Sequence, residues 1–188
     1  FLEDYAYLQW AFIELYQSTY EPEYLTDADS INVEINRLFL DNEKGGFFLY
    51  GNDAEKLITR PKDAYDGAMP SGNSVIAMNL VRLSRITGDL GFSNSYESLI
   101  RTFSGQISAT PLGYMHMLTS YLFYSRPSEH VILVSDEPEN MVLPFINAIR
   151  EEFRPFTTSV LYSKKYGRLE GIIPHIKDYP VHNGKTLA

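Results

Sequence analysis

Apolar residues recur along most of the chain in two patterns that alternate with one another. In the segments 2–17, 74–87 and 111–124, apolar side chains occupy nearly every side of a helical projection. A helix of that kind is surrounded by protein. In the segments 22–40 and 93–107, apolar residues recur at steps of three and four with polar residues between them, which indicates a helix with one wet face. The pattern therefore predicts helices in the order inner, outer, inner, outer, inner.

This alternation is typical of helical hairpins arranged in a ring, in which each buried helix is backed by an amphipathic one. The fold predicted for residues 1–127 is therefore mainly α, a partial α/α toroid. Short turns at 18–21 and 88–92 join inner helices to outer ones, whereas the connection 41–70 is long. Long connections carry function or extra structure, and the glycines and aromatic residues at 44–53 predict a β-hairpin insertion.

The pattern of apolar residues changes in the last part of the chain, residues 128–188. Two β-branched, apolar segments at 130–135 and 157–162 flank a helix-like segment at 139–153. This order predicts a small βαβ unit, and strands connected in that way are parallel with a right-handed crossover. We therefore expect two domains, the partial toroid at 1–127 and a small α/β appendage at 128–188.

Composition and charge limit the classes of partner. The formal charge of −8 is spread along the chain, which argues against a surface that follows nucleic-acid phosphates or an anionic membrane. No apolar run approaches the roughly 20 residues of a bilayer-spanning helix. We therefore expect neither nucleic acid nor a membrane as partner. With no cysteine and only four scattered histidines, the chain offers no thiolate chemistry and no clear ligand set, so no metal and no cofactor is predicted.

The beginning of the chain suggests that it is part of something longer. The first residue is Phe1 rather than methionine, and the helical pattern begins at Leu2. No basic-plus-apolar leader with a small-residue cleavage site is present. We therefore expect the C-terminal part of a larger soluble protein, with the cytoplasm as its compartment.

The segment that leads into the second inner helix, residues 60–74, is rich in turn-forming and hydrogen-bonding residues. The first inner helix likewise opens on Glu3 and Asp4. If both helices start at the same end of the ring, the acidic groups face a common hollow. Two carboxylates with different pKa values in such a hollow would act as general acid and general base. Aromatic side chains would provide flat surfaces on which sugar rings pack. The catalytic candidates are Asp66, Glu3 and Asp4, and the substrate-binding candidates are Arg60, Tyr65, Ser71, Asn73 and Phe47.

Each candidate also has an ordinary structural explanation. An acidic residue or serine before a helix most often caps it, and an acidic pair in the first turn complements the helix dipole. Arg60 pairs by default with Asp63 or Asp66. His116 lies in an apolar helix, where a satisfied core histidine is the more common case. The segment 60–74 as a unit is equally compatible with an architectural bend and with a ligand site.

Four short segments carry a family resemblance: Glu3-Asp4-Tyr5-Ala6, Gly45-Gly46-Phe47-Phe48, Arg60-Pro61-Lys62 and residues 66–74. With them the chain resembles the bacterial YyaL and human spermatogenesis-associated protein 20 family over nearly its whole length. The resemblance implies a thioredoxin-like domain upstream, followed by a six-hairpin, glycosidase-like α/α toroid similar to N-acylglucosamine and cellobiose epimerases. This chain matches the last part. The related epimerases use histidine bases, and no histidine of this chain matches one residue by residue.

Two functional hypotheses follow from different classes. The first is a carbohydrate-binding or carbohydrate-modifying toroid, with isomerase, epimerase or glycosidase-like activity in the intact protein and none in this part alone. The second is a non-catalytic scaffold that presents client proteins to the upstream thioredoxin-like domain. The expected partners are a carbohydrate ligand and the N-terminal part of the same protein. A scaffold should expose an apolar patch, whereas a sugar site should be concave, aromatic and acidic.

Overall fold

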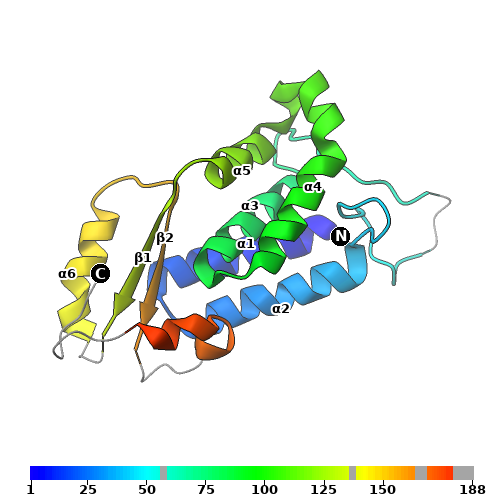
Figure 1. Cartoon of the computed structure of the whole chain (residues 1–188). Coiled ribbons are helices and arrows are strands. Elements are labelled where there is room, and N and C mark those ends of the chain that lie inside the picture. Colours follow the sequence, from blue (N-terminus) through cyan, green and yellow to red (C-terminus); the bar gives the residue numbers. More distant parts are fainter. Residues whose placement is uncertain (56–58, 136–138, 164–168, 180–188) are drawn as a thin grey trace.

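The computed structural model describes residues 1–55, 59–135, 139–163 and 169–179, with the backbone alone of residues 139–141. It is mainly helical with one small sheet (Figure 1). The elements in chain order are α1 (Leu2–Thr19), α2 (Pro22–Phe39), α3 (Gly72–Thr87), α4 (Leu90–Ala109), η1 (Pro111–Tyr114), α5 (Met115–Ser125), β1 (Glu129–Val134), α6 (Glu139–Arg150), β2 (Thr157–Tyr162) and η3 (Pro174–Asp178).

Helices α1 and α3 lie side by side between α2 and α4 (Figure 1). Helix α1 packs against α2 and α3, and α3 packs in turn against α4 and α5. Helix α3 is the centre of the core, because twelve of its sixteen residues are buried. Helices α2 and α4 bury a single stripe each, around Leu25 and Ile35 in α2 and around Tyr96 and Leu99 in α4. The predicted contrast between α3 and the amphipathic helices α2 and α4 is therefore confirmed.

Helices α1 and α5 are less buried than the sequence predicts. On α1, Leu8 is 45% exposed and Leu15 is 40% exposed. On α5, Tyr121 and Leu122 are 49% and 43% exposed. The reason is that helices cover only part of the circumference of each: α1 contacts α2 and α3, and α5 contacts α3. Among the described residues, therefore, only some of the apolar side chains of α1 and α5 are covered by other helices.

Local signals explain where α3 and α4 begin and end. The hydroxyl of Ser71 accepts a hydrogen bond from the Ser74 N–H at 3.2 Å, which caps the start of α3. Gly88 ends that helix in a left-handed conformation with φ of 70°, which glycine adopts without steric cost. The carboxylate of Asp89 then accepts a hydrogen bond from the Gly91 N–H at 2.7 Å. This cap starts α4 at Leu90, slightly earlier than the apolar pattern indicates.

The predicted β-hairpin over residues 44–53 is wrong. The chain reverses at residues 41–46, where Gly45 and Gly46 both have positive φ, 72° and 70°. The turn brings together only one isolated antiparallel bridge, between Leu40 and Phe47. A hairpin needs extended residues before its turn, but those positions belong to the last turn of α2. The chain after Phe47 therefore has no strand to pair with.

The predicted βαβ unit is present, with parallel strands. Strands β1 and β2 pair in register from Glu129 opposite Thr157 to Val134 opposite Tyr162. Helix α6 lies between them in the sequence and ends at Arg150, three residues before the predicted limit. The short helix η3 follows in a segment for which the sequence predicts no element.

The sheet is fastened to the C-terminal end of α1. The side-chain amide of Gln17 donates to the carbonyl of Ser159 (2.7 Å) and accepts from the N–H of the same residue (3.1 Å). The hydroxyls of Tyr20 and Ser159 are also hydrogen bonded at 2.7 Å, and Arg150 donates to the carbonyl of Ser18. Strand β2 also contacts α3, so the strands extend the helical core rather than standing apart from it.

Candidate functional site

Asp66, the first catalytic candidate, supports the start of α5. Its Oδ2 accepts hydrogen bonds from the N–H groups of His116 (2.8 Å) and Met117 (3.4 Å), and its Oδ1 accepts one from the Ser71 N–H (3.0 Å). Its own N–H donates to the carbonyl of Gly113 at 2.7 Å. A carboxylate at this place satisfies free N–H donors of a helix start and complements its dipole. Both oxygens of Asp66 are thus engaged by the backbone.

Asn73 and Phe47, two of the substrate-binding candidates, belong to the core. Asn73 has no exposed surface, and Phe47 is 2% exposed. The Asn73 Oδ1 accepts from the Phe47 N–H (2.9 Å), and its Nδ2 donates to the carbonyls of Phe47 (2.9 Å) and Asp63 (2.7 Å). The amide therefore holds two parts of the connection between α2 and α3 against the first turn of α3, and both its oxygen and its nitrogen are bonded to the backbone.

Arg60, a third candidate, also bonds to the backbone. Its Nη2 donates to the carbonyls of Tyr50 (2.7 Å) and Leu38 (3.3 Å). Its guanidinium lies 4.1 Å from the centre of the Phe48 ring, close enough for a cation–π interaction. Arg60 therefore fixes the end of α2 against the following loop. The pairing with Asp63 or Asp66 that the sequence favours is not formed.

The remaining four candidates line one cavity of about 630 Å³ between the start of α1 and the loop before α3. We call it the N-terminal cavity. Asp63 adds a further carboxylate to its wall, and Tyr7 adds a second phenol ring. The structure thus brings acidic and aromatic groups from both helix starts to a common hollow. The candidates that line it are Glu3, Asp4, Tyr65 and Ser71.

Tyr7, in the wall of this cavity, is held in place by a hydrogen bond. Its hydroxyl donates to the carbonyl of Pro70 at 2.9 Å. Burial, followed by the charges of Asp66 and Glu3, raises the pKa of Tyr7. The phenol therefore keeps its proton at neutral pH. Its ring stacks on that of Trp10, with centroids 6.0 Å apart and planes at 21°.

A second cavity, of about 460 Å³, lies further along α1, between α1, α3, α5 and the segment before β2. We call it the central cavity. In its wall the Glu14 Oε1 accepts hydrogen bonds from Trp10 Nε1 (2.8 Å) and Arg82 Nη1 (2.6 Å). Burial raises the pKa of Glu14, but the hydrogen bond and charge of Arg82, with the Trp10 bond, outweigh it and the pKa is lowered. Glu14 therefore stays ionised in an orientation set by two donors.

His116 lines the central cavity from α5. Its ring centroid lies 5.3 Å from that of Trp10. Burial lowers the pKa of His116, and the charge of Asp66 opposes this only in part, so the imidazole is neutral at neutral pH. Its Nε2 is buried and has no hydrogen-bond partner among the residues that the structure describes. The expectation of a core histidine with all its hydrogen bonds formed is therefore wrong for His116. Buried polar atoms without a partner are uncommon in proteins.

The two cavities lie along one stripe of α1. Residues at alternating steps of four and three share a helical face, and here these residues carry carboxylate, aromatic and amide groups. The stacked rings of Tyr7 and Trp10 join the N-terminal cavity to the central one. We call this surface the α1 stripe, and it consists of Glu3, Tyr7, Trp10, Glu14 and Gln17.

Sequence reasoning missed Trp10, Glu14 and Arg82. A signal for the first two exists, because their positions share the helical phase of Glu3 and Tyr7, but the apolar residues on the other sides of the helix obscure it. No comparable signal exists for Arg82. Its approach to Glu14 depends on how α1 and α3 are aligned, which is a tertiary property.

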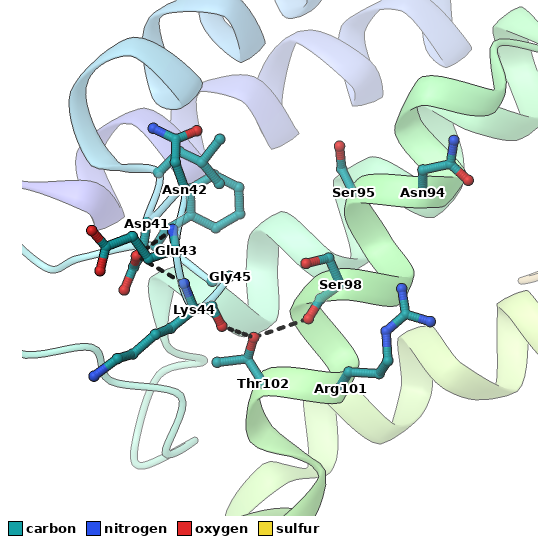
Figure 2. Close-up of a pocket in the computed structure, with 13 residues that line it drawn as sticks. Asp41, Asn42, Glu43, Lys44, Gly45, Asn94, Ser95, Ser98, Arg101 and Thr102 are labelled. Carbon is teal, nitrogen blue, oxygen red and sulfur yellow. Dashed lines mark hydrogen bonds between the residues drawn. The ribbon is translucent and has the colours of Figure 1, made fainter.

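A third cavity, of about 580 Å³, lies between the turn at 41–46 and α4, and most of the residues that line it are polar (Figure 2). The Thr102 hydroxyl lies within hydrogen-bond distance of the carbonyls of Lys44 (3.0 Å) and Ser98 (2.9 Å), as the dashed lines show. The hydroxyl therefore links the turn to α4.

The same turn is held on its other side by a partly buried ion pair. Lys62 Nζ donates to the Asp41 Oδ2 (2.7 Å) and to the carbonyl of Gly45 (2.7 Å). The hydrogen bond from Lys62, followed by one from the N–H of Lys44, lowers the pKa of Asp41 to about 2. Asp41 and Lys62 therefore have a structural role in holding the turn.

Two general classes of site find no support in the described parts of the chain. Among those residues, no group of three or more histidine, aspartate or glutamate side chains is arranged to hold a metal ion. None of the helices described is both long enough and apolar enough to span a bilayer.

Comparison with known proteins shows which proteins this chain is similar to. It is similar to spermatogenesis-associated protein 20 from human and from rat, at 28% identity over 164 residues in both cases. The matches cover 86% of this chain and only 21% and 20% of those proteins, so the chain spans about a fifth of their length. The resemblance seen in the sequence motifs is thereby confirmed, and the matches are consistent with a C-terminal part of that family. No family model matches the chain.

Proposed function

We propose that the α1 stripe is a carbohydrate-binding face. The observation that carries this proposal is the stacked pair Tyr7 and Trp10 between the carboxylates Glu3 and Glu14, above two cavities. The C–H face of a sugar ring packs on aromatic rings, and its hydroxyls donate to carboxylates. A concave site with aromatic walls and a few oriented polar groups is the usual form of a small-molecule site.

We further propose that the paired helices are part of an α/α toroid. The pairs α1–α2 and α3–α4 have the hairpin arrangement that such a ring repeats. The exposed apolar sides of α1 and α5 are the surfaces that neighbouring helices would cover. The much greater length of the similar proteins supports a further contribution from the N-terminal part of the same protein, with its thioredoxin-like domain.

Binding and any carbohydrate-modifying reaction would use different groups of the stripe. Glu14 is ionised and fixed by Trp10 and Arg82, so it is suited to hold hydroxyls. Glu3 and Asp4 line the more open N-terminal cavity. In an isomerase, epimerase or glycosidase-like reaction they would supply the acid and the base.

Calorimetric titration of the intact protein with glucose, N-acetylglucosamine and cellobiose tests this proposal. Glu14→Gln should weaken sugar binding by about tenfold or more, because hydrogen bonds to charged groups contribute about 1.5–3 kcal/mol. Trp10→Ala should weaken it similarly through loss of the stacking surface. The matched control is Glu34→Gln, which removes a glutamate from an exposed pair with Arg37 on α2. Absence of sugar binding, or an equal loss in the control, refutes the proposal.

A second candidate function is the non-catalytic scaffold. The observation in its favour is the exposed apolar surface on α1, where Leu8 and Leu15 share one side of the helix. Exposed apolar patches commonly bind other proteins. In this proposal neighbouring helices of the intact protein would leave this side of α1 uncovered, and the patch would present client proteins to an upstream thioredoxin-like domain.

The double variant Leu8→Ser with Leu15→Ser separates the two functions. If the scaffold proposal holds, it loses binding of an unfolded, alkylated test protein while sugar binding is unchanged. The control is Val33→Ser, which replaces an apolar residue that is 58% exposed on α2. Equal capture of the test protein by all three forms contradicts the scaffold proposal.

A further inference from the structure

A fourth cavity, of about 660 Å³, lies where α3, α4, α5 and β1 meet. The chain as a whole carries 24 acidic and 16 basic residues, yet among the described residues no carboxylate lines this cavity. We call it the serine–arginine cavity. The polar groups that define it are Ser84, Arg85, Ser93, Ser125, Ser128 and His130.

Arg85 supplies the fixed positive charge of this cavity. It lies in the last turn of α3, and its Nη2 donates to the carbonyl of Tyr124 near the end of α5 at 3.1 Å. Closing a helix end in this way is a common role for arginine. It uses one of five N–H donors of the guanidinium. Arg82, one turn earlier, is paired with Glu14, whereas no carboxylate of the described residues forms an ion pair with Arg85.

Four serines line the cavity together with Arg85. The hydroxyls of Ser84 and Ser93 are hydrogen bonded to each other at 2.6 Å, which joins α3 to α4 at the cavity wall. Ser125 and Ser128 also line the cavity, and neither hydroxyl has a hydrogen-bond partner among the residues that the structure describes. These two hydroxyls are therefore available to donate to a ligand or to water, since Ser125 is exposed and Ser128 is partly exposed. Closing the end of α5 does not require them.

His130 completes the cluster from β1. Its Nδ1 is hydrogen bonded to the Thr158 hydroxyl at 2.9 Å, which sets the orientation of the ring. Partial burial, followed by the nearby His175 and Arg85, lowers the pKa of His130. His175 also lies against the cavity rim, since its Cε1 is 2.9 Å from the place where a Cβ at Gly88 would be. Cationic and titratable groups thus converge here from α3, β1 and η3.

We propose that the serine–arginine cavity binds the phosphoryl group of a small phosphorylated molecule. An arginine fork matches two oxygens of a tetrahedral oxyanion, and the hydroxyls of Ser125 and Ser128 donate to the others. His130 adds a further donor when its Nδ1 accepts from the Thr158 hydroxyl, because the neutral ring then carries its proton on Nε2. The volume leaves room for the remainder of a small ligand beside the phosphoryl group. This proposal is independent of the carbohydrate function proposed for the α1 stripe.

Calorimetry of the intact protein at constant ionic strength tests it with inorganic phosphate and with glucose 6-phosphate. Both probes should bind, and Arg85→Met should weaken both by about tenfold or more, because a charge-assisted hydrogen-bond pair is lost. The control is Arg126→Met, which removes the same charge from an exposed position close by and should change affinity by less than about twofold. No binding of either probe, or equal effects of the two substitutions, overturns the proposal.

A second variant keeps the proposal testable if the loss of the Tyr124 bond prevents Arg85→Met from folding. The double substitution Ser125→Ala with Ser128→Ala removes two hydroxyls that hold nothing else in place, and it should weaken both probes by about threefold or more. Unchanged affinity overturns the proposal. The proposal is also overturned if Glu14→Gln weakens glucose 6-phosphate binding and the double serine substitution does not. In that case the ligand binds to the α1 stripe.

Discussion

Replacing Asn73 with alanine should lower the free energy of unfolding by about 3 kcal/mol, because three hydrogen bonds of about 1 kcal/mol each are lost. The bonds join the Asn73 amide to the N–H and carbonyl of Phe47 and to the carbonyl of Asp63. The amide is completely buried, so water does not replace it. For a chain of this size the loss corresponds to a decrease in Tm of about 6–12 °C.

Urea unfolding followed by circular dichroism measures this change. Asn73→Asp is the informative companion variant: it keeps the acceptor for the Phe47 N–H but places a second oxygen against two carbonyls, so it should be no more stable than Asn73→Ala. The control is Asn94→Ala, which changes an exposed position on α4 and should stay within about 0.5 kcal/mol.

A loss below about 1 kcal/mol in Asn73→Ala would refute the reasoning, because a buried amide with three backbone bonds contributes more than that. The same variants separate a structural from a ligand-binding role. If the amide is a clamp, sugar affinity of the folded Asn73→Ala protein equals that of the wild type. A folded variant of normal stability that has lost sugar binding would restore Asn73 to the site.

Three further predictions concern other charged groups. Asp66→Ala should lower the free energy of unfolding by about 1–2 kcal/mol through loss of the cap on α5, and Asp66→Asn, which keeps one acceptor, should lower it less in urea unfolding. The pKa of Asp41 is lowered to about 2. Its contribution to the free energy of unfolding is therefore present above the pKa of the unfolded state and is lost as the pH falls toward about 2. In urea titrations at different pH values, Asp41→Asn should remove this part of the dependence of stability on pH. Partial burial, His175 and Arg85 lower the pKa of His130, and a bound sulfate, which does not titrate near neutrality, should raise it. The affinity for sulfate should therefore increase as the pH falls from about 8 to about 6, and His130→Gln should reduce that increase in calorimetry.

Much of the fold was accessible from the sequence because its signals are local. Ser71 and Gly88 mark both ends of α3, where a side-chain cap and a left-handed residue are needed. The order of the segments around β1 and β2 predicts their parallel pairing. The hairpin failed for a non-local reason: the glycines at 45 and 46 do form a turn, but α2 occupies the residues that would have formed the first strand.

The site was only partly accessible, for a different reason. Glu3 and Ser71 reach the same cavity because both lie at helix starts. Asn73 and Asp66 are likewise polar residues near a helix start, yet their polar atoms bond to the backbone. A hydrogen-bonding residue at a helix start looks the same in a sequence whether its partner is a ligand or a peptide group. Arg82 required the packing of α1 on α3 and was not predictable.

The amide of Gln17 has a consequence for self-association. A two-stranded parallel sheet has an unpaired outer side on each strand, and such sides recruit strands from other molecules. Because the Gln17 side chain bonds to both the N–H and the carbonyl of Ser159, it occupies the place that one peptide unit of an incoming strand would take. Gln17→Ala should therefore open the outer side of β2 to intermolecular β-pairing, detectable as faster, concentration-dependent aggregation with increased thioflavin fluorescence.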